Sequence, residues 1–255
     1  MKTPGLLSKS LSQVTGRVYR MPILVLYAHS RCNCRCLMCD IWRDNGNVWE
    51  LSTEEIASRV EQFRDLGVEW ILLSGGEALM HSEFASFARI LKENGFRVTV
   101  HSTGLLMEKL AQDLVDVSSD IIVSLDGSPP VHDAIRNVPR AFERLEKGIK
   151  TVKRLAPEFR VTARCVLQRS NFRDLDNILD TVIGLGLDQV SFLAADVSTD
   201  AFNRPEPWSS ERQEQIQLDV QEVDELRHIL ENLAVERHDL FESGLIAESP
   251  EKLRR

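Results

Sequence analysis

The sequence has no hydrophobic run long enough to cross a membrane. An apolar stretch near its start, residues 21–28, is short and leads directly into cysteines. It lacks the small-residue cleavage site of a secretory signal. We therefore expect a cytoplasmic protein with no membrane partner.

An excess of basic residues is also missing. The 255 residues include 31 Lys and Arg against 39 Asp and Glu, which gives a formal net charge of −8. Because a nucleic-acid binder needs a basic face for phosphates, we expect no nucleic-acid partner. With 43% hydrophobic and 27% charged residues, the composition is that of a globular protein with one large domain or two small ones.

The cysteines are too clustered for a disulfide framework. There are five, and four of them fall between residues 32 and 39, which suggests metal binding in a cytosolic protein. Structural zinc sites usually combine two distant ligand pairs, but here the histidines are scattered singly and Cys165 stands alone. A compact thiolate loop suits an iron–sulfur cluster, although four cysteines this close could also surround one zinc ion in a cramped geometry.

Short β-rich runs alternate with amphipathic helices along most of the chain. The expected strands are 23–27, 70–73, 97–101, 121–125, 161–167 and 189–193. The first helix should begin at Ser52, with Glu55 as its capping-box partner, and stop at Gly67. Asn171 should cap a later helix, and a single helix should run from Ser210 to Leu233. Such alternation implies a parallel α/β sheet, either barrel-like or open and doubly wound.

Polar residues and glycines follow the expected strands where each one ends. They are the cysteines, residues 74–77, residues 102–104 and residues 126–127. Both parallel architectures place their sites at the carboxyl ends of the strands. We therefore expect these segments to meet in one functional site.

Three of these segments together resemble the motifs of the radical S-adenosylmethionine (SAM) superfamily. Cys32, Cys36 and Cys39 have its C-x-x-x-C-x-x-C spacing, directly after an apolar strand. Residues 75–77 match its G-G-E signature, and residues 124–127 resemble the S-x-D-G of the subgroup with SPASM or Twitch-type C-terminal extensions. The resemblance implies a partial (β/α)6 TIM-like barrel of parallel strands.

The resemblance also implies a mechanism. The three motif cysteines would hold a [4Fe–4S] cluster with one iron open to SAM, and an electron donor such as flavodoxin or ferredoxin would supply one electron. SAM would then yield a 5′-deoxyadenosyl radical that takes hydrogen from an unidentified peptide or small metabolite. We expect an oxidoreductase of unknown reaction subclass. The alternatives are an electron carrier or redox sensor, which could recruit Cys34 as a fourth ligand, and a zinc-binding interaction module. We interpret Cys34 as a small residue filling an apolar position.

The resemblance implies nine contacts to SAM. They are Met38, Gly75, Gly76, Glu77, Ser102, Thr103, Ser124, Asp126 and Gln168. Met38 replaces a frequent aromatic residue and would meet adenine partly through its backbone, while Glu77 would lie near the amino group. The hydroxyls and Asp126 would serve the ribose and the methionyl carboxylate. Asp126 could equally serve only the turn that follows it.

We divide the chain into an N-terminal arm (1–20), a radical SAM core (21–207) and a C-terminal helix with a polar tail (208–255). The loop after the last strand, which contains Asp196, Asp200, Asn203, Arg204, Pro205 and Pro207, is the candidate for substrate contact. No cysteine follows Cys165 to hold an auxiliary cluster. We expect either a minimal family member or a chain without its C-terminal part, with a lateral gap in the barrel.

Overall fold

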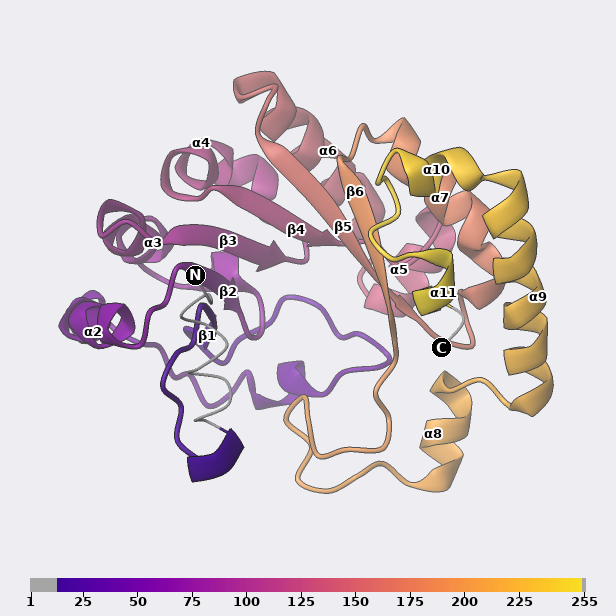
Figure 1. Ribbon diagram of the computed structural model, residues 1–255, viewed down its shortest axis with the longest axis horizontal. Helices are drawn as coiled ribbons and strands as arrows, with labels where there is room; N and C mark the ends of the chain where they lie inside the picture. Colours follow the sequence, from indigo (N-terminus) through magenta and orange to yellow (C-terminus); the bar gives the residue numbers. More distant parts are fainter. Residues whose placement is uncertain (1–12, 254–255) are drawn as a thin grey trace.

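A single parallel sheet organises the computed structural model, which describes residues 13–253 (Figure 1). Its strands follow one another in the order β1-β2-β3-β4-β5-β6. They are β1 Ile23–Tyr27, β2 Trp70–Ser74, β3 Arg97–Ser102, β4 Asp120–Ser124, β5 Arg160–Leu167 and β6 Gln189–Ala194. Within the described residues β1 and β6 do not pair, so the barrel is open between them. This confirms the predicted partial barrel. Of the predicted N-terminal arm, residues 1–12 lie outside the described part.

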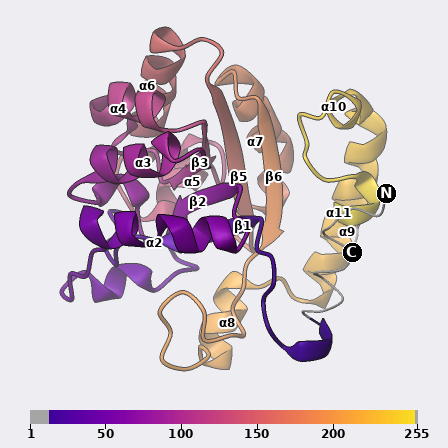
Figure 2. The same ribbon diagram turned by 60° about the vertical axis from the view of Figure 1, so that its left-hand side comes forward.

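Helices surround the outer side of this sheet (Figures 1 and 2). The main ones are α2 Thr53–Asp65, α3 Phe84–Glu93, α4 Met107–Val117, α5 Pro129–Arg136, α6 Ala141–Leu155 and α7 Leu175–Gly184. Short 3-10 turns are η1 Ile41–Asp44, η2 Ala78–Met80 and η3 Phe172–Asp174. None of the helices within residues 13–253 is long and apolar enough to cross a membrane.

The predicted start of α2 is confirmed. The Ser52 hydroxyl accepts from the Glu55 N–H at 3.1 Å, and the Glu55 carboxylate accepts from the Ser52 N–H at 2.8 Å. After the helix, Gly67 adopts a φ of +68°, which glycine tolerates without a steric cost.

Side chains alternate between the two faces of the strands. Ile71 and Leu73 of β2 are buried in the main core under the helices, while Leu72 between them lines a cavity inside the barrel. Because side chains in a strand alternate with a period of two, each strand contributes one set of residues to the core and another to the cavity.

The C-terminal region differs from the single helix expected from Ser210 to Leu233. Two helices are present instead, α8 Ser210–Ile216 and α9 Val220–Glu236. The break occurs because a second capping box, between Asp219 and Glu222, begins a new helix.

The predicted polar tail is folded in its described part. It contains α10 His238–Glu242 and α11 Pro250–Leu253, and these helices lie with α9 on the β6 side of the molecule (Figure 2). Ile246 is buried and forms a parallel bridge with Val190 of β6. The tail therefore covers part of the β6 edge.

Two further expectations need correction around β5. Asn171 does not cap a helix through its side chain, since η3 follows it and α7 begins only at Leu175. Its side-chain amide instead donates to the carbonyls of Asp126 at 2.8 Å and Val166 at 3.0 Å. Asn171 thus ties the ends of β4 and β5 together. Helix α5, which follows β4, was not expected from the sequence.

Candidate functional site

A cavity of about 380 Å³ lies at the carboxyl ends of the strands. Its wall contains the three motif cysteines and six of the nine residues expected to contact SAM. The six are Met38, Gly75, Gly76, Ser102, Thr103 and Ser124. The separate sequence motifs therefore do meet in space. Glu77, Asp126 and Gln168 do not form part of this wall, and each needs its own explanation.

The cysteine loop is held by bonds to two distant segments. The N–H of Arg35 donates to the carbonyl of Arg136 at 3.1 Å, and that of Leu37 donates to the carbonyl of Ile135 at 3.0 Å. The Asn45 side chain makes two bonds of 2.9 Å with the backbone of Cys32. The loop is thus fixed at its start and in its middle by groups that its own sequence does not reveal.

The thiols differ in position and acidity. Cys32, Cys36 and Cys39 line the cavity, whereas Cys34 is buried among apolar side chains. A hydrogen bond from the Cys34 thiol, together with the charge of Arg136, lowers the pKa of Cys36 to about 7. Burial raises the pKa of Cys32 to about 12 and that of Cys39 to about 11. Cys36 is therefore the readiest of the three to become a thiolate.

Arg136 is a charged residue of the cavity wall that the sequence motifs did not indicate. Its Nη1 lies 3.5 Å from the Cys36 sulfur, and its Nη2 forms a 2.5 Å ion pair with Asp126. Burial alone would lower the pKa of Arg136, but the Asp126 carboxylate and the neighbouring Cys36 and Cys34 sulfurs together more than offset this and raise it. Arg136 ends the unexpected helix α5, so no motif or periodicity identified it.

Asp126 lies behind Arg136 rather than in the cavity. One oxygen pairs with the guanidinium, and the other accepts from the N–H of Val166 at 2.9 Å. The structure therefore does not support direct contact between Asp126 and SAM. The carboxylate positions Arg136 instead.

Glu77 is likewise turned away from the cavity. Its Oε1 accepts from the Ser102 hydroxyl at 2.6 Å and from the N–H of Leu79 at 3.1 Å, and its Oε2 accepts from the N–H of Thr103 at 2.5 Å. The side chain is fully buried, so its carboxylate is not placed to meet the amino group of SAM. It joins the loop after β2 to the loop after β3.

The two positions before Glu77 require glycine for different reasons. Gly75 has a φ of +117°, which side chains rarely tolerate. Gly76 packs so closely on the cysteine loop that a Cβ there would lie 1.9 Å from the carbonyl oxygen of Arg31. The next residue, Glu77, donates its N–H to that same oxygen at 2.8 Å. The glycine pair thus brings the two loops together.

Gln168 supports the cavity from behind. It is buried, and its Nε2 lies 3.7 Å from the sulfur of Met38. Met38 lies in the cavity wall, whereas Gln168 does not. The predicted direct contact between Gln168 and SAM is therefore not supported.

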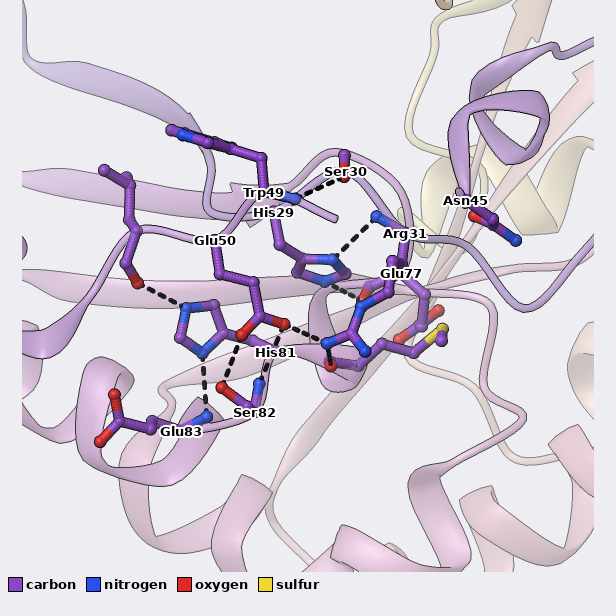
Figure 3. Close-up of polar contacts among 12 residues, drawn as sticks. His29, Ser30, Arg31, Asn45, Trp49, Glu50, Glu77, His81, Ser82 and Glu83 are labelled. Carbon is purple, nitrogen blue, oxygen red and sulfur yellow. Dashed lines mark hydrogen bonds and ion pairs between the residues drawn. The ribbon is translucent and has the colours of Figure 1, made fainter. Parts of the chain in front are cut away.

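A polar network holds the cysteine loop and the loop after β2 in register (Figure 3). The N–H of Arg31 donates to His29 Nδ1 at 3.1 Å, so Nε2 carries the ring hydrogen and donates to the carbonyl of Glu77 at 2.6 Å. Arg31 also forms an ion pair with Glu50, whose carboxylate accepts from the Ser82 hydroxyl at 2.5 Å. Since His29 is buried, its pKa is lowered and the neutral ring is favoured.

The loop after β6 closes one side of the cavity. Asp196, one of the residues predicted to contact substrate, lies in the cavity wall, and so does Phe202. Asp200, Asn203 and Arg204 do not. The buried Arg204 instead donates to the carbonyl of Met38 at 3.1 Å, and thereby ties this loop to the cysteine loop.

Asp40, directly after the last motif cysteine, strengthens this connection. It accepts from the indole N–H of Trp208 at 2.6 Å and forms a 2.9 Å ion pair with Arg212. The loop after β6 and the start of α8 are therefore anchored on the cysteine loop.

Comparison with known proteins identifies the family of the chain and relates its fold to solved structures. Residues 26–182 match the family model described as the radical SAM superfamily. The chain belongs to the radical SAM superfamily. Membership makes it an enzyme, and it implies SAM and an iron–sulfur cluster, typically [4Fe–4S], as cofactors.

The relatives are longer proteins. This radical SAM chain is 30% identical over 168 residues to the Fe-coproporphyrin III synthase of Methanosarcina barkeri, a match that covers 63% of the chain and 41% of the relative. It is 31% identical over 123 residues to a probable GTP 3′,8-cyclase of Methanococcus maripaludis, covering 47% of the chain and 41% of the relative. The matches thus span less than half of either relative.

Solved structures share the fold at lower identity. Streptococcus suis SuiB bound to S-adenosylmethionine has a TM-score of 0.67 at 14% identity, covering 91% of the chain and 52% of SuiB. The protein anSMEcpe with bound AdoMet has a TM-score of 0.69 at 18% identity, covering 88% of the chain and 60% of that protein. These matches show a common fold.

The donor set of this radical SAM chain fits an iron–sulfur cluster. Three thiols converge on one cavity, and thiolates are the ligands of such clusters. Within residues 13–253, no three His, Cys, Asp or Glu side chains are grouped around a point that could hold a single metal ion.

Proposed function

We propose that Cys32, Cys36 and Cys39 hold a [4Fe–4S] cluster and that SAM occupies the adjoining cavity. When bound, the cluster and SAM supply a one-electron cleavage whose 5′-deoxyadenosyl radical removes hydrogen from a substrate. The observation that carries this proposal is the convergence of the three cysteines and the Gly75–Gly76 pair on one cavity wall. The electron would come from a cytoplasmic donor such as flavodoxin or ferredoxin.

Arg136 and Ser124 are placed to bind the methionyl carboxylate. Arg136 is fixed between Asp126 and Cys36, so its remaining surface faces the cavity beside the cluster cysteines. A guanidinium binds carboxylates strongly, and its orientation here is already set. Ser124 lies in the same wall, and no bond to another described residue engages its hydroxyl.

Unlike Ser124, Ser102 and Thr103 have hydroxyl groups that already donate hydrogen bonds within the protein. The Ser102 hydroxyl donates to Glu77, and the Thr103 hydroxyl donates to Asn33 at 2.9 Å. Each oxygen can still accept a hydrogen bond from a ribose hydroxyl. We propose that role for them, with the adenine against the backbone around Met38.

Closure of the cavity protects the radical reaction from water. Phe202 and Asp196 supply one side through the anchored loop after β6. Exclusion of water prevents side reactions of a reactive intermediate. The gap between β1 and β6 is the part of the barrel that substrate would approach.

Formation of 5′-deoxyadenosine tests the proposal. Anaerobically reconstituted protein with SAM and dithionite should produce it, and the Cys36→Ala variant should not. An electron carrier or redox sensor would keep its cluster but produce none. The position of Cys34, outside the cavity wall, supports a three-cysteine cluster with an open iron.

A further inference from the structure

The inner face of the barrel carries two nitrogen-bearing side chains with no role in the proposed cluster or SAM site. Arg164 on β5 and His101 on β3 both line the cavity. In the sheet register, Arg164 lies between Ser124 of β4 and Ser191 of β6. A packed barrel interior is normally filled by apolar side chains, so a cation here calls for an explanation.

Arg164 is a cation without a protein counter-charge. Its Nε donates to the Ser191 hydroxyl at 3.3 Å, and within residues 13–253 it forms no ion pair with a carboxylate. The other charged side chains of the cavity wall each have a partner of opposite charge, since Arg136 pairs with Asp126 and Asp196 forms a 3.9 Å ion pair with Arg204. Charges in sheltered sites are normally paired, so Arg164 leaves room for an anion.

His101 offers a second polar group without a partner. Its Nε2 is buried and has no hydrogen-bond partner among the described residues, while its Nδ1 lies 3.5 Å from the Ser74 hydroxyl. Burial, helped by the charge of Arg164, lowers the pKa of His101 to about 4, so the ring is neutral. When the Ser74 hydroxyl donates to Nδ1, Nε2 carries the hydrogen and can donate it to a ligand in the cavity.

We propose that Arg164 and His101 receive an anionic group of the substrate, a carboxylate or a phosphate. This inference rests on the proposed function, because it takes the cavity to be the site of the radical reaction. The Arg164 guanidinium supplies charge and paired donors, and the His101 N–H supplies a further donor. Anchoring that group would hold the rest of the substrate in a fixed orientation toward SAM.

The carboxylate of SAM itself is the competing occupant. Arg136 contacts the sulfur of Cys36 and therefore lies beside the cluster, whereas Arg164 is directed by its bond to Ser191 toward β6. The two arginines thus serve different parts of the cavity. SAM would use Arg136, and the substrate would use Arg164.

Binding of simple anions tests this inference. Calorimetry would measure the binding of inorganic phosphate and of glutarate to reconstituted protein saturated with SAM. We expect at least one of these anions to bind, and Arg164→Gln to weaken that binding at least tenfold. Arg164→Lys should keep part of it because the charge remains. The matched control is Arg160→Gln on the same strand, and it should bind like wild type. Arg160 is exposed at the amino-terminal end of β5, where its side chain bonds Gln189.

Each outcome decides the inference. Binding of phosphate alone identifies a phosphate-bearing substrate, binding of glutarate alone a carboxylate-bearing one, and binding of both a general anion site. No binding of either anion, or equal binding by Arg164→Gln, overturns the inference. A tenfold loss of SAM affinity in Arg164→Gln also overturns it, because Arg164 would then serve SAM. Iron content and 5′-deoxyadenosine formation in the same samples test the proposed function separately.

Discussion

Replacing Gly76 by alanine should separate the two loops that build the cluster end of the cavity. The added Cβ would lie 1.9 Å from the carbonyl oxygen of Arg31 and 2.5 Å from its carbonyl carbon. Both of these atoms belong to the backbone, so no flexible side chain can yield. The loops must move apart by about 1.5 Å to reach the 3.4 Å of an ordinary van der Waals contact.

The loss of stability in Gly76→Ala follows from the contacts that this movement breaks. The 2.8 Å bond from the Glu77 N–H to the same oxygen would be lost, at about 1 kcal/mol. Overpacking in a tight contact adds about 1–3 kcal/mol. We expect the free energy of unfolding to fall by about 2–4 kcal/mol and SAM affinity to fall at least tenfold.

Denaturant unfolding and equilibrium SAM binding measure both effects. Gly184→Ala is the matched control, since Gly184 ends α7 with nothing within 4 Å of an added Cβ. That control should be neutral or stabilise the protein by up to about 1 kcal/mol. If Gly76→Ala unfolds and binds SAM like wild type, the close approach of the loops described here is wrong.

Three further predictions concern the cluster, pH and the loop after β6. Cys34→Ala should retain iron and sulfide after reconstitution while Cys36→Ala loses them, and the reverse pattern would refute the ligand assignment. Burial lowers the pKa of His132 to about 3 from an unfolded value of 6.5, so its contribution to stability is complete above pH 6.5 and is lost as pH falls toward 3. The free energy of unfolding should therefore drop by about 1.4 kcal/mol per pH unit in that range through this group, and His132→Gln should remove that share of the slope. Asp40→Ala should release the anchored loop, so that limited proteolysis cuts between residues 195 and 209 faster than in wild type; equal rates would show that Asp40 does not anchor it.

The barrel and the position of its site could be predicted because their signals are local. Strand periodicity, the capping box at Ser52 and the cysteine spacing each depend on residues close together in sequence. The carboxyl ends of parallel strands then meet by topology alone, which is why most of the predicted SAM residues share one cavity wall with the cysteines.

The exact role of each polar residue could not be predicted because it depends on partners distant in sequence. The Glu77 carboxylate accepts hydrogen bonds from Ser102 and Thr103, and the Asp126 carboxylate pairs with Arg136. A motif shows that a carboxylate is present but not which group satisfies it once it is buried.

The most direct test of the central claim is pulsed electron paramagnetic resonance of the reduced protein with SAM labelled by ¹⁵N at its amino group and ¹³C at its carboxylate. If three cysteines hold the cluster and SAM occupies the adjoining cavity, both labels should show hyperfine coupling to the cluster, and the coupling should persist in Cys34→Ala. A reduced cluster without coupling to either label would contradict the account, because SAM would not bind at the open iron.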